Sequence, residues 1–271
     1  MEINNDTVVC ISLASRPGNF GATVHNAAYR ALGLNFLYKA FGISDIKGAV
    51  AGVRALGIRG CSVTMPFKVQ VIKELDELDD AAQSIGAVNT VVNENGRLLG
   101  CNTDAYGAEV ALQSLPITKD DTVLLLGAGG VAKAILYALG RLGVRRIFIS
   151  TRTEAEASRG MFSPCDFVQW ELRHETKAGI IINATPIGMS PDDDHVPIDL
   201  KKTQGCRAVM DVVVSPMESL LVRTAKDMGL RVVPGYKMSL YQAAAQFQLY
   251  TGANAPLDVM ERAITQLLQL P

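Results

Sequence analysis

The sequence predicts an α/β protein with two domains. Short runs of β-branched residues alternate with helical segments from one end to the other, which is typical of βα units around a mostly parallel sheet. A glycine-rich turn directly follows one of these runs near residue 127. The chain has 271 residues, which is longer than most domains with a single hydrophobic core. This length favours about two domains.

The first hundred residues predict one α/β domain. Four runs are expected to be its strands, at residues 7–13, 35–41, 59–64 and 88–92. Helices are expected between them, at residues 23–34, 44–56 and 68–85. An Asn-Gly pair, Asn95-Gly96, separates the run 88–93 from 97–99, and such a pair between two strands is typical of a tight β-hairpin.

A second series of strands begins near Asp120. Its strands are expected at residues 122–126, 146–150, 179–182, 208–214 and 230–233, followed by helices at 238–251 and 256–269. No strand lies between these two helices to extend the second sheet, so we expect them to cross back onto the first domain. The prediction is therefore a discontinuous domain of residues 1–102 with 237–271, a second domain of residues 103–236, and a cleft between them.

Composition and charge exclude several classes of protein. The chain carries 26 Lys and Arg against 27 Asp and Glu, and this formal charge of −1 provides no field that would attract nucleic acid or an anionic membrane. No run approaches the roughly 18 consecutive apolar residues of a membrane helix, and the polar start lacks the features of a signal peptide. We expect a cytoplasmic protein with neither a nucleic-acid nor a membrane partner.

The cysteine and histidine patterns indicate neither disulfides nor a metal. The five cysteines are scattered without a C-x-x-C pair, which predicts reduced side chains that are mostly buried. The three histidines show no metal-binding spacing, so no metal is expected. His25 lies on an otherwise apolar helix and is interpreted as a core or interface residue. The sequence gives no indication of the oligomeric state.

The glycine-rich turn predicts a dinucleotide site. After the strand 122–126 come Gly127, Ala128, Gly129, Gly130, Val131 and Ala132, and then an apolar helix. The G-x-G-x-x-A spacing allows a tight turn, a close approach to a pyrophosphate and close packing of helix on strand. The helix N-terminus adds free N–H groups and the positive end of a dipole. The alternative is a tight βα turn without a ligand, but the strand, turn and helix together favour a Rossmann-type domain.

The end of the next strand predicts which dinucleotide is bound. An NAD-binding protein usually places an Asp or Glu there, on the ribose 2′-hydroxyl. Here the residues are Thr151, Arg152 and Thr153. A guanidinium and two hydroxyls suit a 2′-phosphate, so NADP(H) is favoured over NAD(H). The alternative for Arg152 is a solvated residue after a strand.

Several sequence blocks together resemble the shikimate dehydrogenase family. In order along the chain they are Ser62-Val63-Thr64-Met65-Pro66-Phe67-Lys68, Gly86-Ala87-Val88-Asn89-Thr90, Gly100-Cys101-Asn102-Thr103-Asp104, Asn183-Ala184-Thr185-Pro186, Asp211-Val212-Val213-Val214-Ser215-Pro216 and Gly235-Tyr236-Lys237-Met238 to Gln242. The resemblance covers nearly the whole chain. It implies reversible hydride transfer between NADPH and the 3-keto carbon of 3-dehydroshikimate, a small-molecule substrate, in the cleft between the domains.

The resemblance also assigns residues to roles. It implies that Lys68 and Asp104 are catalytic and that Thr64, Asn89 and Gln242 bind the ring hydroxyls. The residues that it places beside the cofactor are Asn183, Ala184, Thr185, Met189, Val212, Gly235 and Met238. Taken alone, Lys68 fits a solvated lysine at a helix start, Asp104 or Thr103 fits an N-cap, and Gln242 with Gln246 fits the polar edge of a helix.

The chain departs from the family pattern near its N-terminus. Counting back from His25, Asn19 and Gly21 stand where the family has two serines that hold the substrate carboxylate. Val214 stands where the family has a tyrosine, and Ser62 where it has an asparagine. These departures resemble the shikimate dehydrogenase-like subgroup, and Arg16 is a candidate for the carboxylate contact. The alternatives are a quinate or aminoshikimate dehydrogenase, a tetrahydrofolate-dependent dehydrogenase, and an NADP(H)-binding sensor with little catalysis.

The expected chemistry fits an ammonium group at Lys68. A ketone that is reduced to an alcohol develops negative charge on its oxygen, and a positioned ammonium stabilises that charge and delivers the proton. A neighbouring carboxylate stabilises the charged form of a lysine. If Lys68 and Asp104 are close, Lys68 is therefore expected to act as a protonated acid in the direction of reduction, while Asp104 orients it and accepts a hydrogen bond from a ring hydroxyl.

Overall fold

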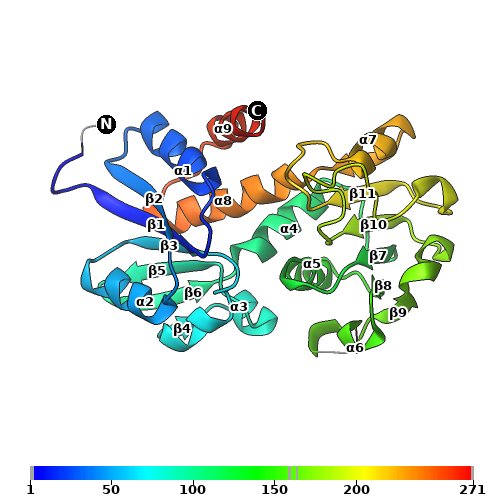
Figure 1. Cartoon of the computed structure of the whole chain (residues 1–271), viewed down its shortest axis with the longest axis horizontal. Coiled ribbons are helices and arrows are strands. Elements are labelled where there is room, and N and C mark those ends of the chain that lie inside the picture. Colours follow the sequence, from blue (N-terminus) through cyan, green and yellow to red (C-terminus); the bar gives the residue numbers. More distant parts are fainter. Residues whose placement is uncertain (1–2, 158–159, 163, 270–271) are drawn as a thin grey trace. The chain divides into compact units, whose positions relative to one another are not determined.

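The computed structural model describes residues 3–157, 160–162 and 164–269 of the chain. The chain divides into two compact units. Unit 1 consists of Met1–Thr103 and Gln242–Pro271, and unit 2 of Asp104–Tyr241. In Figure 1, unit 1 holds the blue and cyan elements together with the red helix at the C-terminal end, whereas the green and yellow elements belong to unit 2. No helix in the described part of the chain is both long and apolar enough to cross a membrane.

Unit 1 is built on a six-stranded mixed sheet in the order β2-β1-β3-β5-β6-β4. Its strands are β1 (Val8–Ala14), β2 (Phe36–Gly42), β3 (Gly60–Val63), β4 (Glu77–Leu78), β5 (Thr90–Glu94) and β6 (Arg97–Cys101). The strand β1 pairs in parallel with β2 and β3, whereas β5 is antiparallel to both β3 and β6. The predicted hairpin is confirmed, with positive φ angles of 54° at Asn95 and 92° at Gly96.

The helices of unit 1 differ from the prediction in one segment. They are α1 (Phe20–Ala31), α2 (Ile46–Ala55), the 3₁₀ helix η1 (Gln70–Glu74), α3 (Asp80–Ile85) and α9 (Leu257–Leu268). The single helix expected over residues 68–85 is wrong. The chain leaves η1 to pair as β4 with β6, and α3 then starts afresh because the Asp79 carboxylate caps it by accepting from the N–H of Ala82.

The end of α8 and all of the last helix pack against the other elements of unit 1. Helix α8 (Gly235–Thr251) begins in unit 2 and ends in unit 1, and α9 packs against α1. At β3, a Cβ on Gly60 would collide with the ring of Tyr250. The Arg59 Nε also donates to the Tyr250 carbonyl at 3.0 Å. The end of α8 therefore lies directly on the sheet of unit 1, at a point where only glycine leaves room.

Unit 2 is built on a six-stranded parallel sheet in the order β12-β11-β10-β7-β8-β9. Its strands are β7 (Thr122–Leu126), β8 (Arg146–Thr151), β9 (Asp166–Gln169), β10 (Ile180–Asn183), β11 (Ala208–Asp211) and β12 (Arg231–Val233). Counted from β7, this is the order 6-5-4-1-2-3 of a Rossmann fold, so the order reverses between β7 and β10. The strand expected over residues 208–214 ends at Asp211, and β9 was not predicted.

Helices cover both faces of this parallel sheet. They are α4 (Thr103–Gln113), α5 (Gly130–Arg141), α6 (Glu154–Ala157) and α7 (Leu220–Asp227), with 3₁₀ turns η2 (Gly160–Phe162), η3 (Trp170–Glu175) and η4 (Leu200–Lys202). Alternate residues of β7 face opposite sides: Val123 and Leu125 pack in the core with α4 and α5, whereas Leu124 packs in the core with α7. Both faces are buried, which explains why these strands are almost continuously apolar.

Candidate functional site

The glycine turn lies where the strand order of unit 2 reverses. Gly127 follows β7 with a φ of 100°, and its N–H donates to the Ser150 carbonyl at 2.8 Å. A Cβ at Gly127 would lie 2.9 Å from the Ala184 carbonyl oxygen, which belongs to the segment after β10. Both the backbone conformation and the close approach require glycine here. Ligands of open α/β sheets bind in the crevice at this position.

The turn leaves an open cradle at the N-terminus of α5. A Cβ at Gly129 or Gly130 would meet nothing within 4 Å, and both residues are exposed. Gly129 is the N-cap of α5 and supplies no side chain to satisfy its first N–H groups. Ala128 and Val131 are half-buried at the turn, and Ala132 packs fully buried in the core. This arrangement fits a pyrophosphate, whose oxygens can accept hydrogen bonds from the N–H groups at the start of the helix. The positive end of the helix dipole also stabilises its negative charge.

The residues predicted to bind the 2′-phosphate lie beside this cradle. In the parallel pairing of β7 with β8, Leu126 is opposite Ser150, so Arg152 follows β8 at the edge where Gly127 follows β7. Arg152 and Thr153 are exposed, whereas Thr151 is 5% exposed. A guanidinium at this edge has the charge and geometry to bind a phosphate.

The predicted cofactor residues after β10 are held by hydrogen bonds inside the protein. The Asn183 amide donates to the Asp211 carboxylate at 2.9 Å, and its oxygen accepts from the N–H and the hydroxyl of Thr185 at 3.0 and 2.6 Å. Asn183 is fully buried. Its side chain therefore shapes the loop that carries Ala184 and Thr185 past the glycine turn. Met189, further along this loop, is 42% exposed.

The start of α8 packs tightly against the segment after β11. A Cβ on Gly235 would collide with the backbone of Val212 and Val213. Val212 is half-buried, and Met238 is 6% exposed in the core of unit 2. The predicted cofactor residues Val212, Gly235 and Met238 are thus brought together, at the carboxyl end of the parallel sheet.

In unit 1, the Asn89 amide is fixed in one orientation. Its oxygen Oδ1 accepts from the Thr90 hydroxyl at 2.8 Å, the Thr103 N–H at 2.8 Å and the Thr103 hydroxyl at 3.1 Å. Gln242 Nε2 donates to the same Thr103 hydroxyl at 3.3 Å. These donors occupy the amide oxygen, so only Nδ2 remains to act on a ligand, and it can only donate.

A small cavity of about 200 Å³ in unit 1 is lined by Gln242 and, among others, by six further polar side chains. The polar side chains come from β1, α1, β2, β3, the residue after β3 and α8 and include no charged group: Ser12, His25, Tyr38, Ser62, Thr64, Gln242 and Gln246. Two predicted substrate residues, Thr64 and Gln242, therefore line it together. Ser62 and His25 were not predicted to bind substrate, and the i, i+4 spacing of Gln242 and Gln246 was the signal that could have indicated the cavity.

The other residues predicted to bind substrate or to act in catalysis, Asn89 included, do not line this cavity. Lys68 is half-buried in the turn after β3, and its carbonyl accepts from the N–H of Val88 at 2.8 Å. Asp104 is half-buried in the first turn of α4, at the start of unit 2. Asn19 and Arg16 are exposed before α1, and the Asn19 side chain makes no capping hydrogen bond. The interpretation of Gln246 as a polar helix edge is wrong, since it is 3% exposed.

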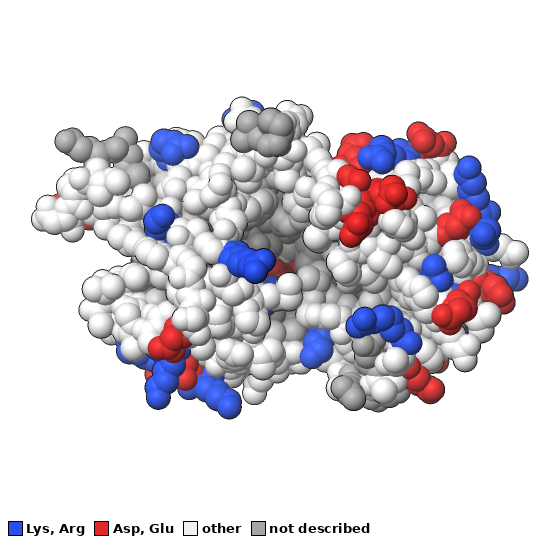
Figure 2. Space-filling view, viewed as in Figure 1, with Lys and Arg blue, Asp and Glu red and all other residues white. Residues whose placement is uncertain are grey.

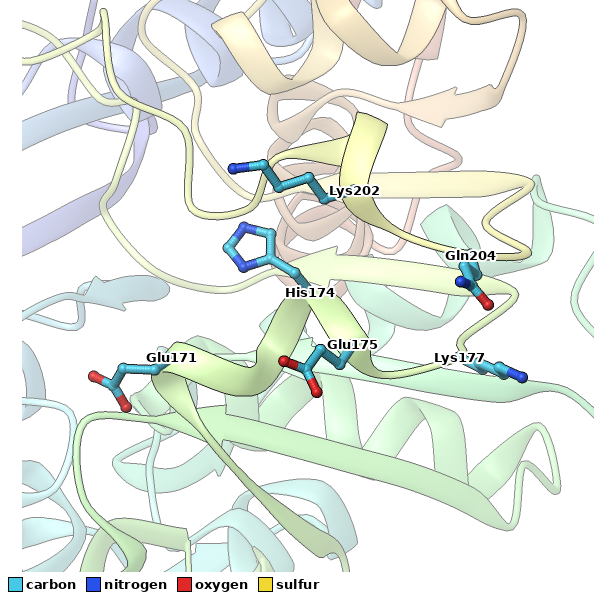
Figure 3. A pocket seen from close by; sticks show the side chains of 6 residues that line it. All are labelled: Glu171, His174, Glu175, Lys177, Lys202 and Gln204. Atoms are coloured by element: carbon cyan, nitrogen blue, oxygen red, sulfur yellow. The ribbon is translucent and has the colours of Figure 1, made fainter.

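A second hollow, in unit 2, has no comparable organisation. Figure 3 shows its lining side chains spread along η3, η4 and the segments that follow them: Glu171, His174, Glu175, Lys177, Lys202 and Gln204. His174 Nε2 already accepts from the N–H of Asp199 at 3.1 Å. Charges of both signs are also scattered over the face shown in Figure 2. Among the residues described, no group of three His, Cys, Asp or Glu is placed to hold a metal.

Two family models match the chain at its ends. The model described as the shikimate dehydrogenase substrate binding domain matches residues 20–91, and that of the shikimate 5′-dehydrogenase C-terminal domain matches residues 235–265. A shikimate dehydrogenase-like protein of Haemophilus influenzae is 38% identical over 251 residues, which is 92% of each chain. The shikimate dehydrogenase (NADP(+)) of Methanocaldococcus jannaschii is 37% identical over 97% of this chain and 98% of its own.

Solved structures share the whole architecture. A shikimate 5-dehydrogenase-like protein superposes with a TM-score of 0.92 at 36% identity, covering 97% of this chain and 98% of that one. A shikimate dehydrogenase in complex with NADP+ gives 0.90 at 34% identity, covering 99% and 98%. The quinate dehydrogenase of Corynebacterium glutamicum, in complex with NAD, gives 0.88 at 28% identity, covering 97% and 100%.

The fold and the site define an α/β protein with a Rossmann-type dinucleotide-binding unit and a second unit that contains a cavity lined in part by polar side chains. The relatives match this arrangement along nearly their full length. The chain belongs to the shikimate dehydrogenase family.

Proposed function

We propose that the protein is an NADP-dependent oxidoreductase that interconverts shikimate, or a close cyclic polyhydroxy acid, and the corresponding 3-keto acid. The observation that carries the proposal is the pairing of two features in one chain of this family. One is the open glycine cradle with Arg152 beside it. The other is the cavity of unit 1, which is lined by uncharged polar side chains that include Thr64 and Gln242.

The cofactor, when bound, supplies or accepts the hydride. The cradle at Gly129 and Gly130 binds its pyrophosphate, and Arg152 with Thr151 and Thr153 binds the 2′-phosphate. The rest of the cofactor would be held by residues that follow β10 and β11 and begin α8, namely Ala184, Thr185, Met189, Val212, Gly235 and Met238. Asn183 shapes the first of these segments. Open backbone at a helix N-terminus and a guanidinium next to it support this assignment.

Lys68 acts as the acid in the direction of reduction. As the ketone takes up a hydride, its oxygen becomes an alkoxide, and the Lys68 ammonium stabilises this charge and transfers its proton to that oxygen. The resulting amine recovers a proton from solvent. Asp104 accepts a hydrogen bond from a ring hydroxyl and thereby orients the substrate.

The substrate ring is held by neutral groups. Asn89 Nδ2, the Thr64 hydroxyl and the Gln242 amide hydrogen-bond its hydroxyls, in keeping with their positions in unit 1. Asn19 and Arg16 approach its carboxylate from the exposed segment before α1. Quinate is the second candidate substrate, because the structure of a quinate dehydrogenase superposes with a TM-score of 0.88.

The thiols support a reducing compartment, which we assign to the cytoplasm. Burial raises the pKa of Cys10 to about 11 and that of Cys101 to about 12, so both remain protonated thiols at neutral pH. Free thiols of this kind are typical of proteins kept in a reducing environment.

A spectroscopic screen tests the function. The appearance of reduced nicotinamide is recorded by its near-ultraviolet absorbance with shikimate, quinate and aminoshikimate, each with NADP and with NAD. We expect turnover with shikimate or quinate and a preference for NADP. Tight NADPH binding without turnover of any acid would instead support a sensor, and better turnover with NAD would contradict the role of Arg152.

A further inference from the structure

We infer that His25, Gln246 and Thr90 form a directional hydrogen-bond chain that fixes the Asn89 amide with its N–H donors toward the substrate. Their role in this inference is to position Asn89, because their hydrogen bonds lead to it. His25 and Gln246 also line the cavity of unit 1, whereas Thr90 does not. The inference rests on the proposed function in one respect, which is that Asn89 faces a substrate oxygen. The direction of the chain follows from the donors and acceptors of unit 1 alone.

The direction is set by a backbone carbonyl. Gln246 Nε2 donates to the backbone carbonyl oxygen of Asn89 at 3.4 Å and to the Thr90 hydroxyl at 2.9 Å. A carbonyl oxygen can only accept, so the NH2 group of the Gln246 amide must face Asn89 and Thr90. The Gln246 oxygen Oε1 must then face the opposite way, toward His25.

The same logic fixes the proton on His25. Its Nε2 lies 3.4 Å from Gln246 Oε1, which can only accept, so Nε2 carries the proton and donates. His25 Nδ1 is buried and has no hydrogen-bond partner among the described residues, which is consistent with a bare nitrogen. Burial lowers the pKa of His25 to about 4, so the ring is neutral near pH 7. The ring of Tyr38 stacks on it at 4.6 Å and holds its plane.

The chain ends at the Asn89 oxygen. Because Thr90 accepts from Gln246, its one hydroxyl proton goes either to Asn89 Oδ1, 2.8 Å away, or to the Thr103 hydroxyl, 2.9 Å away. The Thr103 hydroxyl lies 3.1 Å from the same Oδ1, so a hydroxyl proton reaches Oδ1 by either route. The Thr103 N–H reaches the same oxygen at 2.8 Å. One hydroxyl proton and the Thr103 N–H therefore meet at Oδ1, and flipping the Asn89 amide would place its NH2 group against these two donors. The ligand atom that Asn89 contacts must be an acceptor, such as a hydroxyl or keto oxygen.

The first test is the tautomer of His25, which requires no turnover. In ¹⁵N-labelled protein at neutral pH, long-range ¹H–¹⁵N spectra distinguish the protonated ring nitrogen from the bare one. We expect a neutral ring with the proton on Nε2. A proton on Nδ1, or a doubly protonated ring, would overturn the inference. A protein that turned over none of the acids would contradict the proposed function, while the tautomer would still decide this inference.

The second test replaces one donor of this hydrogen-bond chain by an acceptor. Gln246→Glu replaces the donating NH2 group by an acceptor, so the Thr90 proton is drawn away from Asn89. We expect KM for the acid to rise about tenfold, with kcat and the KM for NADP within about threefold, because the lost contact is a substrate-binding hydrogen bond. The matched control is Gln248→Glu, the same change at an exposed position of α8, which should leave both constants unchanged.

A third pair of variants separates this role from a direct effect on the acid of the charge that Gln246→Glu introduces, because Thr90, unlike Gln246, does not line the cavity. Thr90→Ser keeps the hydroxyl and should behave as the wild type, whereas the nearly isosteric Thr90→Val removes it and should raise KM as Gln246→Glu does. Equal KM values in the two Thr90 variants would overturn the inference, as would an unchanged KM in Gln246→Glu.

Discussion

Asn183 and Asp211 lie directly opposite each other at the carboxyl ends of neighbouring parallel strands, and the Asn183 amide donates to the Asp211 carboxylate at 2.9 Å. Asp211 also accepts from the N–H of Val213 at 3.0 Å and from the hydroxyl of Ser219, which caps α7. One buried carboxylate thus joins the loop after β10, the segment after β11 and the start of α7. The cofactor side of unit 2 depends on this junction.

The first prediction concerns stability and pH at this junction. Burial raises the pKa of Asp211 above its ordinary value. The folded state therefore binds the proton more tightly than the unfolded state, so the contribution of Asp211 is most favourable below its unfolded pKa and is lost as the pH rises through the folded pKa. Asp211→Asn should remove this slope from urea unfolding curves measured between the two values.

The matched variant is Asp211→Ala. It leaves the Asn183 amide and the Val213 N–H buried without an acceptor, so it should lower the free energy of unfolding by about 2–4 kcal/mol. An Asp211→Ala protein as stable as Asp211→Asn would show that the junction carries no stability.

The second prediction separates two glycines of the turn. Gly127→Ala places a Cβ at a φ of 100° and 2.9 Å from the Ala184 carbonyl, so we expect a loss of about 1–3 kcal/mol in unfolding free energy. Gly129→Ala has a φ of −81° and open space, so its stability should be unchanged while NADP affinity falls, since the methyl group intrudes into the cradle. Thermal unfolding and fluorescence titration with NADPH measure the two effects. Equal stability of both variants would contradict the assignment.

The third prediction concerns cofactor choice. Arg152→Ala should weaken NADP binding by about ten- to a hundredfold and leave NAD binding unchanged, because one charge-assisted contact to the 2′-phosphate is lost. Arg146→Ala is the control, since Arg146 is exposed at the opposite end of the same strand β8. Isothermal titration with both dinucleotides measures the change, and a parallel loss for NAD would point to a general effect on the fold.

The fourth prediction concerns Lys68. Lys68→Ala should lower kcat by about 10²–10⁴-fold with a much smaller effect on KM, because the ammonium acts on charge that develops in the transition state. Lys73→Ala removes an exposed lysine from η1 in the same region and should be neutral. Steady-state kinetics with the acid identified in the screen decide the matter. A raised KM with normal kcat would remove Lys68 from the chemistry.

The sequence predicts those parts of the fold whose signals are local. The β7 strand, the glycine turn and α5 lie in one continuous segment, and the Asn95-Gly96 hairpin joins adjacent strands. The break between η1 and α3 was missed because its cause is distant in sequence: β4 pairs with β6, and Leu98 N–H donates to the Asp76 carboxylate at 2.7 Å. A helical pattern over residues 68–85 contains no sign of that partner.

The same distinction applies to the candidate site. Gly127 and Arg152 follow from the order of strand, turn and strand, whereas the chain from His25 to Asn89 joins residues from α1, α8 and the segment before β5. From its apolar helix alone, His25 is predicted to be a core residue, and it is buried, with 1% of its surface exposed. Its influence on Asn89 depends on Gln246, which is 221 positions away in sequence and cannot be paired with it by spacing.

The division of unit 1 between the two ends of the chain bears on the order of events during synthesis. Unit 2 occupies one uninterrupted stretch, Asp104–Tyr241, so all of it is synthesised before the final segment of unit 1. Tyr250, whose ring fills the space over Gly60, belongs to that final segment. We therefore expect unit 2 to complete its fold first, whereas the sheet of unit 1 is covered only when the end of α8 and α9 have been added.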